Sequence, residues 1–239
     1  MMKRNPWEEL YRNQNMSDLH AKLSYFNGES YRLGEADFDH EIMGWLRQYY
    51  SGARVYIDAL VEKLVRENYR FAFPDGYRRA PDPSVLEWAQ ELSETKGIYL
   101  PLTLTAWICE IGNVNLCGSH PQWEKSGYAF EGDINDVWYT DSLVFEVDRE
   151  YILYEHEEWL YRKEEYGEAE TGPFRFSIAP DSIHKANVSG GPPYEILADR
   201  PQVDTLLINE RHGAGVAFYL RNSLDWGGFP GFEYMTKKR

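Results

Sequence analysis

The most regular hydrophobic pattern in the chain lies between residues 42 and 64. Apolar side chains recur there every three or four residues, which is the repeat of one face of an α-helix. The repeat consists of Ile42, Leu46, Tyr49, Ala53, Tyr56, Leu60 and Leu64. We therefore predict a long amphipathic helix that ends near Asn68, with Gly52 as the position at which it would kink or divide.

Three shorter helices are predicted from their start and stop signals. Asp82-Pro83-Ser84 is typical of a helix start, and the apolar residues that follow at helical spacing predict a helix as far as Gly97. Pro101 opens a short helix that Gly112 closes. The last helix is predicted for residues 216–225 and stops at a glycine pair.

Short segments with the alternating pattern of β-strands lie between these helices. Strands are predicted at residues 114–118, 142–147, 174–178, 183–188 and 194–197. Residues 151–163 have helical spacing, but their Tyr and Ile content leaves a strand as the alternative. Residues 1–39 predict an N-terminal arm with a short helix, docked through aromatic side chains. Because helices lead and strands dominate the middle, the pattern indicates the α+β class.

The charge balance narrows the class of partner. The 239 residues include 25 Lys and Arg against 39 Asp and Glu, a formal net charge of −14. Such a field repels phosphate backbones and anionic lipid, so it argues against nucleic acid and membranes and favours a basic protein. The simpler interpretation is that acidity keeps the protein soluble. No secretory leader or membrane-length apolar stretch is found, so we expect a cytoplasmic protein with Cys109 and Cys117 as reduced, buried thiols.

No histidine fits a known catalytic or metal-binding pattern. His156 has no second histidine four residues on, and a solvated helix face explains it better than a metal site. His120, in a Gly-Ser-His-Pro loop, either binds a ligand or fixes the backbone. Asp181, His184 and Lys185 form the most catalytic-looking cluster, which His212 could join in space, yet no nucleophile motif accompanies them. We therefore assign no catalytic residue, no metal and no cofactor.

The glycine-rich segments 189–193 and 227–232 also lack the features of nucleotide sites. Two prolines remove backbone donors from the first, and neither is followed by the lysine and helix start of a P-loop. We predict tight turns in which a Cβ would clash or φ is positive. The glycines concerned are Gly190, Gly191, Gly227, Gly228 and Gly231.

Acidic and aromatic residues alternate between residues 150 and 170. Usually such a run is a solvated face, but clustered carboxylates also steer a basic partner and aromatic side chains anchor interfaces. The predicted partner-binding residues of this stretch are Glu155, Glu157, Glu158, Trp159, Tyr161 and Glu164. His120 and Trp123, in the polar loop 118–136, complete the predicted interface.

Several segments in order resemble the SUKH superfamily, which contains yeast cell-wall-assembly regulators and bacterial immunity proteins. They are residues 97–102 leading to 107–116, residues 140–144, residues 178–191 and residues 227–232. Ser142 stands where the family has proline, so the turn before that strand is expected to differ. The resemblance covers residues 84–233, and it leaves the helical part, residues 1–83, largely without a counterpart.

The resemblance implies a single domain with a central, largely antiparallel sheet backed by helices, preceded by the extra helical segment. It carries over no catalytic residues. Bacterial members commonly neutralise a cognate toxin by binding it, so the resemblance implies an immunity-type protein. A regulatory or scaffold protein without a toxin is the alternative, and a hydrolase that uses Asp181 and His184 is the third. The sequence leaves the oligomeric state open.

Overall fold

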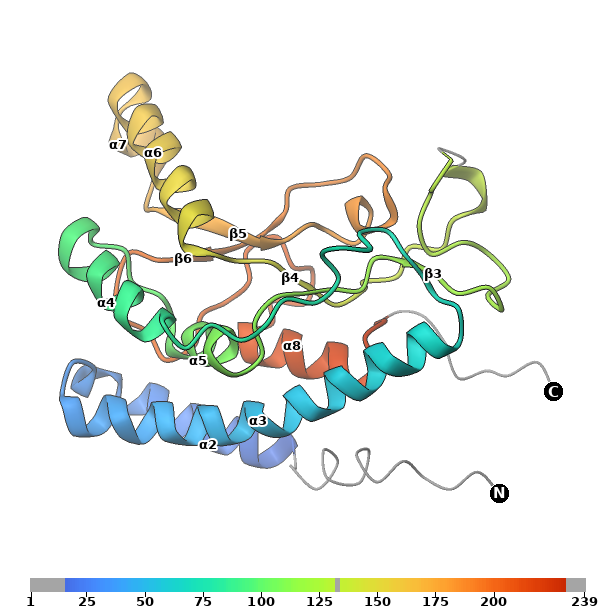
Figure 1. Cartoon of the computed structure of the whole chain (residues 1–239). Coiled ribbons are helices and arrows are strands. Elements are labelled where there is room, and N and C mark those ends of the chain that lie inside the picture. The colour runs from blue at the N-terminus through green and yellow to red at the C-terminus, as the bar shows by residue number, and fades with distance from the viewer. Residues whose placement is uncertain (1–15, 132–133, 231–239) are drawn as a thin grey trace.

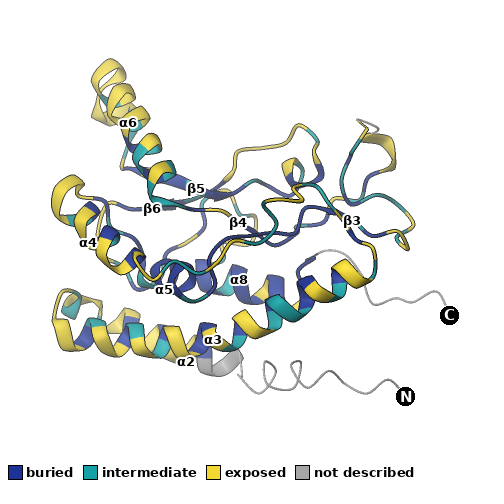
Figure 2. Cartoon of the chain, in the orientation of Figure 1, coloured by how far each residue is buried: buried dark blue, intermediate teal, exposed yellow. Residues whose placement is uncertain are grey.

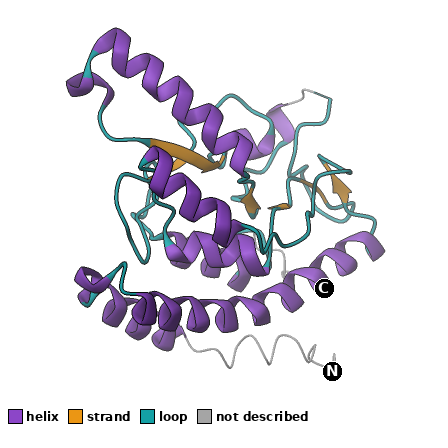
Figure 3. Cartoon of the chain, turned by 60° about the vertical axis from the view of Figure 1, so that its left-hand side comes forward, coloured by secondary structure: helices purple, strands orange, loops and turns teal. Residues whose placement is uncertain are grey.

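Helices lie on both sides of a set of short strands (Figures 1 and 3). The computed structural model describes residues 16–131 and 134–230. α2 (Met16–Gly28) and α3 (Ala36–Arg66) form the lower layer in Figure 1, with α5 (Leu102–Glu110) and α8 (Val216–Asp225) directly above them. The strands follow, and α6 rises from their far side.

The long helix predicted from the hydrophobic repeat is confirmed as α3. Its apolar face is buried, and it packs more extensively against α5 than against any other element. Tyr50 and Trp107 meet edge to face in this contact, with ring centroids 5.4 Å apart. Ile57 is fully buried where the repeat predicted Tyr56, and the helix continues without a break through Gly52.

The predicted boundaries of the shorter helices are also confirmed. α4 (Val85–Lys96) begins after Asp82, whose carboxylate accepts hydrogen bonds from the backbone of Ser84 at 3.0 Å and the indole of Trp88 at 3.1 Å. Gly97 ends α4 in the left-handed conformation, with φ of 68°. α8 has the predicted bounds.

In the part of the chain that the structure describes, the strands form three antiparallel pairs, and the predicted α+β class is confirmed. The pairs are β1 (Arg70–Phe71) with β3 (Gly118–Ser119), β2 (Val114–Asn115) with β4 (Val144–Phe145), and β5 (Arg175–Ala179) with β6 (Tyr194–Leu197). Among the described residues, only the strands β5 and β6 are longer than two residues. A hydrogen bond from the backbone of Glu146 to Ile178 links the second and third pairs.

The strand predicted at residues 183–188 is wrong. This segment forms the 3-10 helix η3 (His184–Ala186), followed by Asn187 in the left-handed conformation. Asp181 explains the difference, because its carboxylate accepts a hydrogen bond from the backbone of His184 at 3.0 Å and so stabilises a turn.

One hydrophobic cluster extends from Leu19 on α2 to Phe229 beyond α8, and both cysteines are buried and free. Phe26 docks α2 into this core, while Tyr25 is half exposed; Trp7 lies outside the described residues. The remaining short elements are η1 (Ser30–Arg32), η2 (Ile134–Asp136) and α7 (Glu168–Thr171). Within residues 16–131 and 134–230, every helix is too short or too polar to cross a membrane.

Candidate functional site

α6 (Arg149–Tyr166) projects from the body of the protein and carries α7 at its tip (Figure 1). Asp148 caps it, because its carboxylate accepts a hydrogen bond from the backbone of Tyr151 at 2.9 Å. A helix therefore forms where the sequence left a strand as the alternative. Ile152 and His156 are its only buried residues, and most of its surface is exposed (Figure 2).

The inner face of α6 is held by aromatic contacts with the chain that leads into β5. The His156 ring stacks on Trp159 and meets Phe174 edge to face, with centroid distances of 5.5 and 5.0 Å. The Trp159 indole donates to the carbonyl of Gly172 at 3.1 Å. Burial, with a smaller contribution from Lys96, lowers the pKa of His156. The prediction of a solvated helix face at His156 is therefore wrong, because His156 and Trp159 attach the helix to the body.

The outer face of α6 alternates acidic and large apolar side chains at helical spacing. Tyr154 and Tyr161 are 59% and 61% exposed. This exposure is high for aromatic side chains, which usually bury a large area in a core or an interface. We call the following residues the α6 outer face: Tyr154, Glu157, Glu158, Leu160, Tyr161, Glu164 and Glu165. All of them are exposed.

The carboxylates of the α6 outer face are not neutralised by neighbours. In the described part of the chain, Glu157, Glu158 and Glu164 make no ion pair, whereas Lys163 is paired with Glu168 at 3.2 Å. Glu155 lies closer to the body, where burial raises the pKa of its carboxyl. Four predicted interface residues, Glu157, Glu158, Tyr161 and Glu164, therefore share one exposed surface, while Trp159 faces inward.

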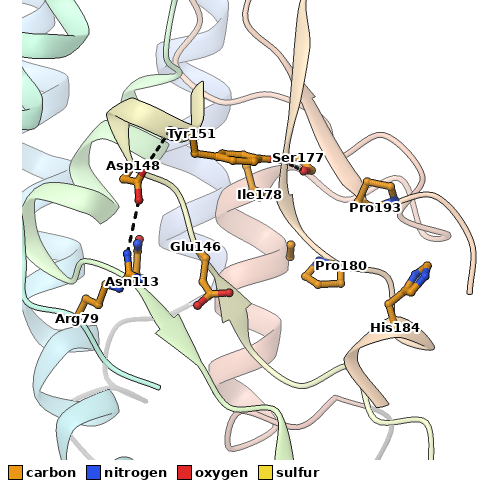
Figure 4. Close-up of a pocket in the computed structure, with 11 residues that line it drawn as sticks. Arg79, Asn113, Glu146, Asp148, Tyr151, Ser177, Ile178, Pro180, His184 and Pro193 are labelled. Carbon is orange, nitrogen blue, oxygen red and sulfur yellow. Dashed lines mark hydrogen bonds and ion pairs between the residues drawn. The ribbon is translucent and has the colours of Figure 1, made fainter. Parts of the chain in front are cut away.

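A pocket of about 570 Å³ lies at the foot of α6 (Figure 4). Its walls come from the chain around β2, β4 and β5 and from the first turn of α6. The residues that line it are Arg79, Asn113, Glu146, Asp148, Tyr151, Ser177, Ile178, Ala179, Pro180, His184 and Pro193. Sequence patterns gave no signal for it, because its lining is gathered from segments far apart in the chain.

Two polar contacts shape this pocket. Arg79 pairs with Asp148 at 3.5 Å, and the Tyr151 hydroxyl hydrogen-bonds the Ser177 hydroxyl. Glu146 projects between them and the proline-rich wall (Figure 4). Glu146 is exposed at the pocket mouth, and partial burial of its carboxyl raises its pKa, although a 3.0 Å hydrogen bond from the Asn115 amide opposes this shift.

The predicted interface loop lies near β3, at the opposite end of the molecule from α6 (Figure 1). His120 is buried: its Nε2 is 3.3 Å from the Glu67 carboxylate, and its Nδ1 accepts from the backbone of Gln122 at 3.1 Å. Trp123 meets Tyr69 and Phe229 edge to face. Both side chains face inward, so the structure does not bring them together with the α6 outer face.

Asp181 and His184 do lie together, but both are engaged in holding a turn. His184 Nδ1 is 2.6 Å from the Asp181 carboxylate, and its Nε2 accepts from the backbone of Gly190 at 3.3 Å. Burial would raise the pKa of Asp181, but backbone hydrogen bonds from His184 and Gly191 lower it overall. His212 pairs instead with its chain neighbour Glu210 at 2.8 Å. Both ring nitrogens of His184 therefore make hydrogen bonds within this turn.

The two predicted reasons for glycine, a clash with a Cβ and a positive φ, hold at some of the predicted turn positions and not at others. A Cβ on Gly190 would lie 2.6 Å from the Asp181 carboxylate, and Gly227 and Gly228 have positive φ. Gly191 meets neither condition: its Cβ would make an ordinary 3.5 Å contact and its φ is unstrained. Gly231 lies outside the described residues.

The sequence did not predict the buried ion pair of Lys185. Its ammonium group is fully enclosed, donates to the Asp141 carboxylate and to the Tyr219 hydroxyl at 2.6 Å, and lies over the Tyr194 ring. Burial raises the pKa of Tyr219 well above its usual value. This group ties η3 to α8 and to the chain before β4.

The chain matches no family model, no curated protein and no solved structure. In residues 16–131 and 134–230, no three His, Cys, Asp or Glu side chains converge as metal ligands would. The geometry of the α6 outer face, of the pocket and of the Asp181 turn is therefore the basis for a functional conclusion.

Proposed function

We propose that the protein is a non-catalytic binding domain that docks a basic protein through the α6 outer face. The observation that carries this proposal is the projecting helix itself. Tyr154, Leu160 and Tyr161 are exposed between unpaired carboxylates. Polar residues at these positions would cost the fold nothing, because the side chains lie outside the hydrophobic core of the described residues. A solvated helix face needs no such anchors.

The two residue types of the α6 outer face supply the two parts of a protein interface. Tyr154 and Tyr161 offer large, rigid surfaces that bury roughly 150–250 Å² each in a complex. The carboxylates around them attract a basic partner and orient it, in agreement with the net charge of −14. The engaged rings of His184 and His120 support a binding role over a hydrolytic one.

The SUKH resemblance adds the class of partner. Immunity proteins of that superfamily commonly neutralise a toxin by direct binding, so the proposed partner is a cognate toxin. The acidic outer face fits a basic nuclease-type toxin, because nucleases carry positive charge where they hold nucleic acid.

A capture experiment with matched variants tests the proposal. Tagged wild-type protein is used to capture partners from native lysate at low salt, beside two charge-reversed proteins. One carries Glu157→Lys, Glu158→Lys and Glu164→Lys. The control carries Glu41→Lys, Glu62→Lys and Glu94→Lys, three exposed positions on α3 and α4, so both have the same net charge.

We expect one basic protein to bind the wild type and the control but not the α6 variant, and to bind more weakly at high salt. The purified partner should inhibit growth when expressed alone and lose this effect when the wild-type protein is co-expressed. Equal loss in both variants would mean that only total charge matters, and a partner that binds the α6 variant normally would refute the docking surface.

A further inference from the structure

Glu146 presents one open carboxylate oxygen to the pocket at the foot of α6. Its Oε2 accepts the hydrogen bond from Asn115, and its Oε1 has no hydrogen-bond partner among the described residues. Figure 4 shows this carboxylate between the Arg79 end and the Pro180 end of the pocket. A group that donates in-plane hydrogen bonds would satisfy this oxygen.

Glu146 makes no ion pair among the described residues, although the nearby Arg79 partly offsets the rise that burial causes in the pKa of its carboxyl. The two carboxylates of the pocket, Glu146 and Asp148, thus face a single arginine. Asp148 is already paired with Arg79 and accepts from the backbone of Tyr151. His184 is held by Asp181 and Gly190 through both ring nitrogens. The pocket therefore favours a cation over an anion or a neutral ligand.

The remaining walls fit a flat cation on an apolar stem. The Tyr151 ring lines the pocket, and its hydroxyl contacts the Ser177 hydroxyl. Ile178, Pro180 and Pro193 form the apolar side. A carboxylate, an aromatic ring and apolar walls together match guanidinium, which stacks on rings and bonds carboxylates in its plane. The volume of about 570 Å³ is typical of ligand pockets.

From these walls and the open oxygen of Glu146, we infer that the pocket binds the guanidinium group of an arginine side chain. Tyr151 lies one turn before Tyr154 on α6, so the pocket lies at the foot of the helix that carries the α6 outer face. The arginine belongs to the partner that docks there, and this part of the inference rests on the proposed function.

Small probes test the pocket without the partner. The wild-type protein, labelled with ¹⁵N, is titrated with N-acetyl-arginine methylamide, and with the citrulline analogue, which has the same shape but no charge. We expect saturable shifts of the amide signals of Tyr151, Ser177 and Ile178 with the arginine probe and none with citrulline. The lysine analogue is expected to bind more weakly, because it lacks the planar fork.

Two variants test whether arginine binding depends on the charge of Glu146. Glu146→Gln keeps the acceptor for Asn115 and removes the charge, so it should weaken arginine binding by about 10- to 100-fold. Glu150→Gln makes the same charge change at an exposed position outside the pocket and should bind as the wild type does. Amide spectra of both variants check that they are folded.

The inference is wrong if arginine and citrulline probes shift the same signals equally, or if Glu146→Gln binds arginine as well as Glu150→Gln does. Because the probes need no partner, this result is independent of the capture experiment. Arginine binding without a captured protein would keep the pocket and remove the proposed function. A captured partner with no arginine binding would do the reverse.

Discussion

Replacement of Gly228, a buried residue of the turn after α8, is expected to be strongly destabilising. Its φ of 86° lies in the left-handed region, and a Cβ there would be 2.6 Å from Leu116 Cδ1 and 3.1 Å from Leu60 Cδ2. Its backbone is fixed on both sides, because its N–H donates to Ser223 and its carbonyl accepts from Leu143, each at 2.7 Å. The turn cannot move away from the leucines without breaking these bonds.

The magnitude follows from two costs. A left-handed conformation costs a residue with a Cβ roughly 1–2 kcal/mol, and overpacking a core costs roughly 1–3 kcal/mol. Gly228→Val should therefore lower the free energy of unfolding by about 2–5 kcal/mol, which for a chain of this length corresponds to a fall in Tm of roughly 4–20 °C.

Thermal unfolding followed by circular dichroism measures this difference. Glu165→Ala, at an exposed position of α6, is expected to change Tm little. Gly227→Ala separates the two costs, since Gly227 has φ of 63° but no close contact beyond the Tyr56 hydroxyl at 3.9 Å. The reasoning is refuted if Gly228→Val and Glu165→Ala have equal midpoints, or if Gly228→Ala costs no more than Gly227→Ala.

Three further outcomes are expected. Lys185→Met should lower the free energy of unfolding in urea by about 3–5 kcal/mol, because Asp141 loses its buried partner; adding Asp141→Asn should recover part of it, and full stability of the single variant would contradict the ion pair's role. His156 has a lowered pKa in the folded protein, so the folded state binds fewer protons than the unfolded state. The contribution of His156 to the free energy of unfolding should therefore be constant at pH values above its ordinary pKa of 6.5 and decline as the pH falls below that value. His156→Phe should remove that part of the decline. A variant whose stability depends on pH as that of the wild type does would contradict the assignment. Burial raises the pKa of the Cys117 thiol to about 12, so alkylation at pH 8 should require unfolding; rapid labelling of the native protein would show that the site is open.

The helices could be predicted from the sequence because their signals are local. The apolar repeat of α3, the Asp82 cap and the Gly97 stop each act within a few residues. The prediction of a strand at residues 183–188 is wrong because side-chain contacts stabilise a different backbone conformation there. Asp181 caps a turn there, and Lys185 is drawn into the core by Asp141, which is distant in sequence.

The candidate site was predicted only in part for the same reason. Composition marked the segment of α6 as acidic and aromatic, but only packing shows that Trp159 faces Phe174 while Tyr161 faces solvent. His120 and Trp123 resemble interface residues in sequence, yet in the structure they pack against each other and Trp123 packs against Phe229. The pocket around Glu146 is formed by tertiary contacts, which no local pattern encodes.

Hydrogen exchange of the captured complex, read by mass spectrometry, tests the central claim most directly. The account predicts that partner binding slows exchange in peptides covering residues 150–166, with peptides of α3 and of the loop 118–130 unchanged. Slowed exchange confined to the loop around His120 and Trp123, with α6 exchanging as in the free protein, would contradict the account.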